Sequence, residues 1–187
     1  MLLNKKDSIL LLVDVQEKLT PAVLDSEAFV LRCEWLLKLA NTMGVPILAS
    51  EQYPKGLGST LESLQPYVDA KEYIEKIYFS CMQEPKYTHR LGEYNKNQLI
   101  LIGIEAHVCV LQTAMEMKGA GFDVYVVVDA VSSRNSLDLK YALKRMKQEG
   151  IHLITSEMVF FEWLRQAGIP EFKDLSQKFL RRNGENK

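Results

Sequence analysis

Three short runs of apolar residues restrict the fold of this 187-residue chain more than any other feature of its sequence. They are ILLLV at Ile9–Val13, LILIGI at Leu99–Ile104 and VYVVV at Val124–Val128. In each run consecutive positions are apolar, so both sides of the segment need burial. This pattern is typical of strands in a parallel sheet that carries helices on both faces.

Weaker runs and the segments between them complete an alternating pattern. Further strands are predicted at Val45–Ala49, Ile151–Ile154 and, from a weaker run, Tyr73–Ile77. Apolar residues at helical spacing predict helices that include residues 30–40, 108–115 and 139–146. A glycine follows each of these helices, where a left-handed C-cap is expected: Gly44, Gly121 and Gly150. This order of elements predicts a three-layer α/β fold with a mostly parallel sheet and right-handed crossovers.

The continuity of this pattern predicts a single domain over residues 1–187. A chain of this length is expected to form one domain with enough buried apolar residues for an ordinary core. No linker, internal repeat or low-complexity segment interrupts it. We expect an amphipathic helix near Phe172–Leu180 and a frayed polar tail over residues 181–187.

Charge and hydropathy argue against several classes of protein. Lys and Arg total 23, and Asp and Glu total 24, which gives a net charge of −1 and argues against a nucleic-acid binder. No apolar run approaches the roughly 20 residues that span a bilayer, and the N-terminus lacks a signal-peptide pattern. The three cysteines are far apart, which argues against a disulfide framework or a structural zinc site. We therefore expect a cytoplasmic protein that binds neither nucleic acid nor membranes.

The residues just beyond the predicted strands are the candidates for function, because open α/β sheets bind ligands at the carboxyl ends of their strands. These candidates are Asp14, Ser50–Tyr53, Lys76, Glu105–Cys109, Asp129 and Ser132–Arg134.

Three of these residues form a chemical set, namely a carboxylate, an amine and a thiol. Cys109 lies in the predicted first turn of a helix, where the helix dipole favours a thiolate. An ammonium group at Lys76 would lower the thiol pKa further, from its usual value of about 8.5. Asp14 would accept the thiol proton and later protonate a leaving group or activate water. Such a set is suited to hydrolysis through a thioester.

Each member also has an ordinary structural explanation, and the residues alone leave both open. An aspartate after a strand is often a helix cap or a solvated end residue, as Asp14 would be. Lys76 would then be a surface lysine. A cysteine in an apolar helical stretch, such as Cys109, usually belongs to the core.

Several motifs together resemble the isochorismatase-like superfamily of cysteine hydrolases. The run GIEAHVCVLQTA at Gly103–Ala114 follows LLLVDVQEKL at Leu10–Leu19 in the order typical of that superfamily. SEQYPKGLGST at Ser50–Thr60, EKIYFSCM around Lys76 and DAVSSRN at Asp129–Asn135 resemble its isochorismatase-domain-containing branch. The likeness extends from about Ser8 to Phe161.

The resemblance implies a six-stranded, Rossmann-like parallel sheet and a role for individual residues. The catalytic triad of the family corresponds to Asp14, Lys76 and Cys109. Its non-proline cis peptide bond corresponds to Ile104–Glu105. The oxyanion hole corresponds to the backbone N–H groups of Glu105 and Cys109. A threonine that is frequent in the family is replaced here by Ala106.

Two departures from related enzymes narrow the expected reaction. Nicotinamidases bind a metal through an Asp-x-His arrangement that corresponds here to Glu51–Tyr53, which contains no histidine. Isochorismatases that cleave a vinyl ether lack the nucleophilic cysteine, whereas Cys109 is present. We therefore expect a hydrolase that needs neither a metal nor another cofactor and that cleaves an amide-type C–N bond in a small molecule.

The same reasoning gives candidate residues for substrate binding, an expected oligomeric state and two alternative functions. Candidate substrate-binding residues are Glu51, Gln52, Tyr53, Phe79 and Arg134. We expect a homo-oligomer, because the family usually oligomerises and symmetric homo-oligomers are common among soluble enzymes. Two alternatives stay open, which are a vinyl-ether hydrolase that uses Asp14 and a non-enzymatic binding or interaction protein on the same fold.

Overall fold

A six-stranded, all-parallel sheet forms the centre of the computed structural model, which describes residues 1–180. The predicted tail at residues 181–187 lies outside the described part. The strands are β1 (Ser8–Val13), β2 (Ile47–Gln52), β3 (Tyr73–Lys76), β4 (Gln98–Gly103), β5 (Asp123–Val131) and β6 (His152–Ile154). They lie in the order β3-β2-β1-β4-β5-β6, and every neighbouring pair is parallel. The predicted fold class is confirmed.

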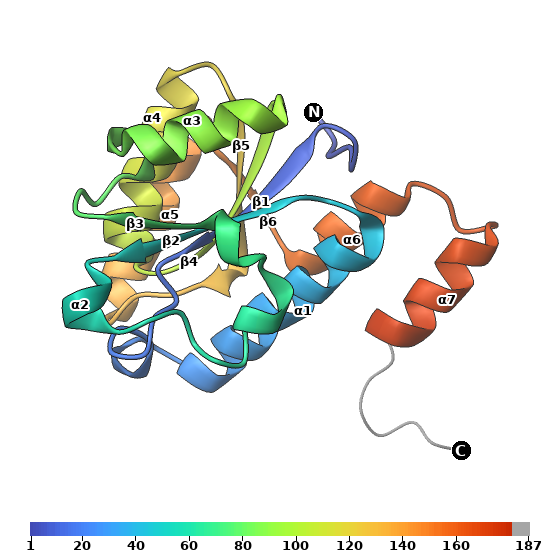
Figure 1. Ribbon diagram of the computed structural model, residues 1–187. Coiled ribbons are helices and arrows are strands. Elements are labelled where there is room, and N and C mark those ends of the chain that lie inside the picture. Colours follow the sequence, from blue (N-terminus) through green and yellow to red (C-terminus); the bar gives the residue numbers. More distant parts are fainter. Residues whose placement is uncertain (181–187) are drawn as a thin grey trace.

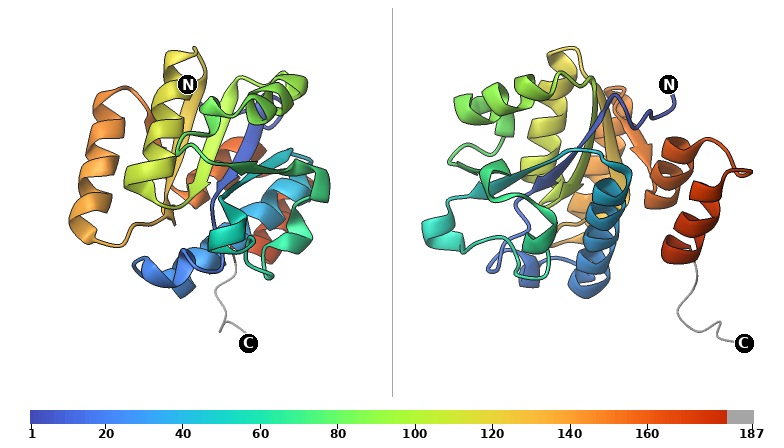
Figure 2. Two further views of the ribbon diagram at one scale, coloured as in Figure 1. Left: turned by 60° about the vertical axis from the view of Figure 1, so that its left-hand side comes forward. Right: turned by 45° about the vertical axis from the view of Figure 1, so that its right-hand side comes forward.

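Helices cover both faces of this sheet (Figure 1). Their bounds are α1 (Ser26–Met43), α2 (Pro54–Leu57), α3 (Pro85–Tyr94), α4 (Leu111–Gly119), α5 (Ser136–Gln148), α6 (Ser156–Leu164) and α7 (Pro170–Phe179). One face packs on α3, α4 and α5, and the other packs on α1 and α6. Helix α7 lies outside α1 in the views of Figures 1 and 2, and the Trp35 indole N–H donates to the Phe179 carbonyl at 3.0 Å.

Strand β1 separates two apolar cores, because its alternate residues point to opposite faces. Leu10 and Leu12 belong to the core under α1 and α6. Ile9, Leu11 and Val13 belong to the core under α3, α4 and α5. Burial on both faces is the reason for the uninterrupted apolar run.

The second strand begins two residues later than its apolar run predicts and ends three residues later. Gly44 closes α1 with a φ of 69°, and the Val45 N–H donates to the Ala40 carbonyl at 2.8 Å. Val45 therefore belongs to the turn that ends the helix. This shift places Ser50 and Gln52 inside β2 rather than in a loop beyond it.

Strand β5 is also longer than predicted and includes Asp129. The Asp129 carboxylate accepts hydrogen bonds from the Ser156 N–H at 2.9 Å and the Ser156 hydroxyl at 2.6 Å. It also pairs with Arg32 at 3.4 Å. Asp129 therefore anchors the start of α6.

A close approach of β1 and β4 requires a glycine at the end of β4. Gly103 has a φ of +121°, and a Cβ atom there would lie 2.1 Å from the Val13 carbonyl oxygen. Such contacts are far inside van der Waals distance and involve backbone, which cannot move independently. Gly103 thus permits the spacing of the two strands whose ends carry Asp14 and Cys109.

Replacing Gly103 with Ala should lower the free energy of unfolding by about 2–4 kcal/mol, because β1 and β4 must separate to admit the methyl group. Urea denaturation measures this change. Gly92→Ala is the matched control, since Gly92 lies in α3 with nothing within 4 Å of an added Cβ atom. The control should be neutral or slightly stabilising. Equal stability of the two variants would contradict this explanation.

Candidate active site

The predicted catalytic residues meet at the carboxyl end of the sheet. Asp14 directly follows β1, Lys76 is the last residue of β3, and Cys109 lies in a π-helical turn, Ala106–Val110, between β4 and α4. β1 and β4 are neighbours from which the strand order proceeds in opposite directions. Ligands of open α/β sheets bind at such a switch point.

Asp14 and Lys76 form a fully buried ion pair. The Lys76 Nζ lies 2.7 Å from the Asp14 Oδ2, and both side chains are 0% exposed. The Asp14 backbone has a φ of 53°, in the left-handed region, where aspartate is one of the more tolerant non-glycine residues. Buried charges are rarely stable without a partner, so each of these groups depends on the other.

Three further oxygen atoms surround the Lys76 ammonium group. The Gln52 Oε1 lies at 2.6 Å, and the carbonyl oxygens of Phe79 and Tyr78 lie at 3.0 and 3.2 Å. Burial is the largest single influence and would lower the pKa of Lys76, but the surrounding groups, with the Asp14 carboxylate first among them, together raise the pKa. Lys76 is therefore a positive charge held inside the protein and is not a surface lysine.

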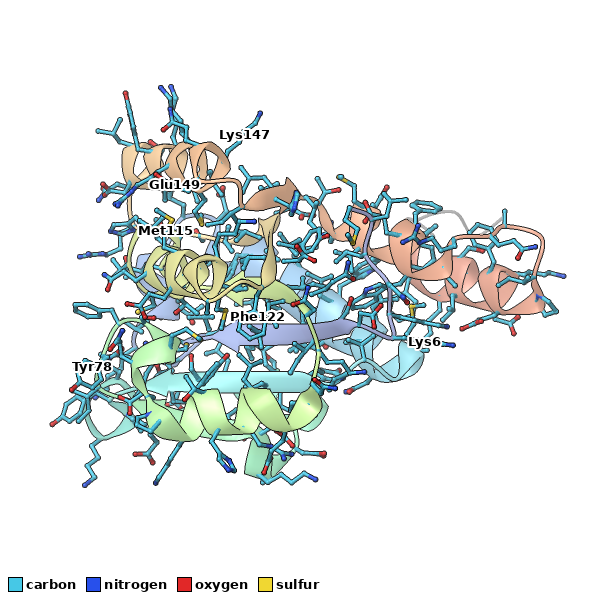
Figure 3. The ribbon with its side chains drawn as sticks, turned by 90° about the horizontal axis from the view of Figure 1, so that it is seen from above. Lys6, Tyr78, Met115, Phe122, Lys147 and Glu149 are labelled. Carbon is cyan, nitrogen blue, oxygen red and sulfur yellow. The ribbon has the colours of Figure 1, made fainter. Side chains whose placement is uncertain are left out.

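The loop after β3 turns its backbone inward and its side chains outward. The carbonyl of Ile77 accepts from the Gln52 amide at 2.7 Å, and the next two carbonyls accept from Lys76. Ile77 is consequently 78% exposed, and Tyr78 points away from the molecule (Figure 3). Phe79 and Tyr53 are 53% and 56% exposed, so they lie at an outer rim and do not form a closed pocket wall.

A cleft of about 510 Å³ lies beside this rim at the outer edge of β3. It is lined by Tyr53, Lys76, Ile77, Glu84 and Lys86, among others. The Glu84 carboxylate accepts from the Ile77 N–H at 2.8 Å. The cleft therefore reaches the strand that carries Lys76 from the side of the sheet.

Gln16, which the sequence analysis did not single out, fixes the position of Gln52. The fully buried Gln16 amide accepts from the Gln52 N–H at 2.7 Å and donates to the Gln52 carbonyl at 3.0 Å. It also donates to the Gly58 carbonyl at 2.6 Å. The Gln16 side chain thus continues the pairing of β2 beyond Val13, where β1 ends. The only signal in the sequence is a glutamine two residues after Asp14.

Cys109 is 6% exposed, and its Sγ lies 4.0 Å from the Gln52 Oε1. Burial raises the pKa of this thiol, and the Asp14 carboxylate raises it further, whereas Lys76 lowers it. The net shift is upward, so the expectation of a thiol activated by a lowered pKa is wrong. The helix start and the ammonium group do not outweigh burial beside a carboxylate.

The other two cysteines are fully buried. The Cys33 Sγ donates to the Ala130 carbonyl at 3.7 Å, away from the site. Cys81 faces Ser50 and Thr113 below Asp14 and Lys76, and burial raises its pKa to about 11. Cys81 therefore packs beside the site without access to solvent.

Glu51 lies on the other face of the sheet from Gln52, because neighbouring strand residues alternate. Its carboxylate accepts from the Thr60 N–H at 2.6 Å, and it lines a separate pocket of about 360 Å³. In that pocket burial raises the pKa of Tyr73 to about 12. The structure does not bring Glu51 together with the other candidates.

The segment before Cys109 contains the expected cis peptide bond between Ile104 and Glu105. The Glu105 carboxylate pairs with Arg134 at 2.7 Å, and the His107 Nδ1 lies 3.0 Å from the Ser133 Oγ. Within residues 1–180 the Glu105 N–H has no hydrogen-bond acceptor. The Arg134 side chain is 58% exposed at the edge of this segment.

Residues 1–180 contain neither a metal-binding cluster of side chains nor a membrane-spanning helix. No group of three or more His, Cys, Asp and Glu side chains is arranged to hold a metal ion. None of the helices combines the length and apolar character needed to cross a membrane.

The ion pair makes a prediction about stability. Lys76→Met leaves a buried carboxylate without a counter-charge, so we expect a loss of about 3–5 kcal/mol in the free energy of unfolding at pH 7. The double variant Asp14→Asn, Lys76→Met removes both charges and should be more stable than Lys76→Met alone. A urea-denaturation cycle measures this. Strictly additive effects of the two substitutions would contradict it.

The same pair predicts how stability depends on pH. Pairing raises the pKa of Lys76 in the folded state, so its stabilising effect is complete below the unfolded value of about 10.4. The effect is lost as the pH rises through the higher folded value.

Comparisons with known proteins agree with this architecture. Residues 8–158 match the family model of the isochorismatase domain. The chain is 37% identical to isochorismatase domain-containing protein 2 of Danio rerio over 183 residues, which cover 95% of this chain and 89% of the relative. It is also 37% identical to isochorismatase domain-containing protein 1 of Danio rerio, over 92% of this chain but only 61% of that longer relative.

Two solved structures have the same fold. The MAR1 ribonuclease from Caenorhabditis elegans superimposes with a TM-score of 0.89 at 34% identity, over 100% of this chain and 98% of that one. The YcaC gene product from Escherichia coli, described as an octameric hydrolase of unknown specificity, gives a TM-score of 0.86 at 26% identity over 96% of each chain. The match to the family model and the similarity to these relatives lead to one conclusion: the chain belongs to the isochorismatase family.

Proposed function

We propose that this protein is a cysteine hydrolase that cleaves an amide-type C–N bond of a small molecule through a thioester. The observation that carries the proposal is the meeting of Asp14, Lys76 and Cys109 at the switch point of the sheet. A solvated aspartate, a surface lysine and a core cysteine would have no reason to converge there. Membership of the isochorismatase family supports a hydrolase.

The charges at the site favour direct proton transfer over a pre-formed thiolate. Before reaction the set contains a carboxylate, an ammonium group and a neutral thiol. As the Cys109 sulfur attacks, its proton passes to Asp14, so that Lys76 then faces a developing thiolate instead of a carboxylate. The net charge of the buried site does not change. The raised pKa of Cys109 is compatible with this sequence, since no free thiolate beside a carboxylate is needed.

The proposed reaction has two stages. First the sulfur bonds to the substrate carbonyl carbon, the C–N bond breaks, and the amine leaves with the proton from Asp14. Then water attacks the thioester, gives one proton to Asp14 and releases the acid, and that proton returns to Cys109. We assign stabilisation of both oxyanions to the N–H groups of Glu105 and Cys109, and the lack of an internal acceptor for the Glu105 N–H supports this.

For substrate recognition we favour the residues whose side chains remain free. Gln52 and Glu51 already make hydrogen bonds within the protein. Tyr53 and Phe79 are exposed at the rim, and Arg134 uses its Nε for Glu105. We propose that these three contact the substrate and that Gln52 instead holds Lys76.

A ribonuclease activity is the description given to the Caenorhabditis elegans relative. We favour a small molecule over RNA for this chain, because its net charge of −1 offers little attraction to a polyanion. We also propose a homo-oligomer, which the octameric description of the Escherichia coli relative supports. A cytoplasmic location would keep a thiol nucleophile reduced.

The test is a screen of small amides, ureas and ureido acids, with a vinyl ether and a short RNA as further arms. We expect turnover of a C–N substrate by the wild type, reduced at least about a thousandfold in Cys109→Ala. Cys33→Ala, which alters a buried thiol away from the site, should retain activity. Cleavage of the vinyl ether or the RNA at an unchanged rate by Cys109→Ala would overturn the thioester mechanism.

Independence of metals is a separate prediction. The region that binds metal in nicotinamidases contains no histidine here. Dialysis against a chelator should leave the measured hydrolysis within about twofold of the untreated rate, because every step above uses protein groups and water. Loss of activity that zinc or manganese restores would show that a metal takes part.

A further inference from the structure

Ser50 holds the Asp14 carboxylate from the side opposite to Lys76. Ser50 lies in β2 and is 1% exposed. Its hydroxyl donates to the Asp14 Oδ1 at 2.7 Å, and its carbonyl accepts from the Asp14 N–H at 3.1 Å. Backbone and side chain of one residue therefore fix both the main chain and the carboxylate of Asp14.

The two carboxylate oxygens consequently have different partners. Oδ1 is bonded to Ser50, whereas Oδ2 lies 2.7 Å from Lys76. A carboxylate held only at one oxygen can rotate about its last bond, and a buried carboxylate oxygen without a donor is costly. We infer that Ser50 is a positioning residue that keeps Oδ2 directed at Lys76 and Cys109, where it accepts the thiol proton. This inference rests on the proposed function.

The remaining groups around Asp14 do not duplicate this role. The groups that face Asp14 are Lys76 from β3, Cys109 from the π turn, and Cys81 from the 3-10 turn Cys81–Gln83. The raised pKa values keep Lys76 charged and both thiols protonated between pH 5 and about 9. Tyr87, behind Cys81, stays neutral as well, since burial raises its pKa. The Ser50 hydroxyl does not titrate in this range, so its hydrogen bond to the Asp14 Oδ1 is available at each pH.

The experiment uses alkylation of Cys109 by iodoacetamide, which needs no substrate. The second-order rate constant is measured from pH 5 to 9 by mass spectrometry of the Cys109 peptide. Ser50→Ala should slow alkylation about tenfold to a hundredfold, the size expected for loss of a hydrogen bond to a charged group.

An isosteric pair separates the hydroxyl group from packing. Ser50→Thr retains the hydroxyl and should be alkylated nearly as fast as the wild type. Ser50→Val has the shape of Ser50→Thr without the hydroxyl, so it should be alkylated as slowly as Ser50→Ala. Ser8→Ala is the matched control. Ser8 is a fully buried serine at the opposite end of β1, where its Oγ donates to the Asn4 carbonyl. The control should be alkylated at the wild-type rate.

Two outcomes would reject the role of Ser50. One is an equal alkylation rate for Ser50→Thr and Ser50→Val, and the other is a loss of rate in Ser8→Ala as large as that in Ser50→Ala. Asp14→Asn distinguishes this failure from failure of the proposed function. If Asp14→Asn slows alkylation and Ser50→Val does not, only the inference about Ser50 is wrong. If Asp14→Asn has no effect, Asp14 is not the base and the proposed mechanism fails as well.

Discussion

The buried ion pair between Asp14 and Lys76 is the constraint on which the rest of the site depends. Two charged groups without access to water need each other as counter-charges. The protein must also supply hydrogen-bond partners for their remaining donors and acceptors. Three protein oxygens besides the carboxylate surround the Lys76 ammonium group, and the Ser50 hydroxyl donates a hydrogen bond to the Asp14 carboxylate. The close spacing of β1 and β4, which Gly103 allows, brings the two strand ends that carry Asp14 and Cys109 together.

The pair also explains how a thiol with a raised pKa can serve as a nucleophile. A carboxylate next to a thiol discourages ionisation of that thiol, but it is also the nearest acceptor for the proton. Lys76 then stabilises whichever partner is negative. In the mechanism we propose, a proton would move between two acids beside a fixed positive charge, so the net charge of the buried site would stay constant.

The apolar runs were sufficient to predict the sheet, because burial on both faces leaves a direct mark on consecutive residues. They also predicted which residues lie at the carboxyl ends of strands, and so Asp14, Lys76 and Cys109 as candidates. Gln16 was not identified as part of the site, and Ser50 was a candidate only by its position after a strand. Each acts through hydrogen bonds to a residue 36 positions away, which the sequence does not show. The direction of the Cys109 pKa shift was also beyond the sequence, because it is a balance of burial and two opposite charges that only the packed site defines.

The loop after β3 divides two tasks between its backbone and its side chains. The carbonyls of Tyr78 and Phe79 hold the ammonium group, while the side chains of the same residues face outward. Every amino acid supplies the same carbonyl, so substitutions at these two positions can alter the rim without releasing Lys76. If the rim binds substrate as we propose, single substitutions in this loop would change what is recognised while the buried ammonium group stays in place. Such a loop would let substrate preference evolve separately from the charge pair.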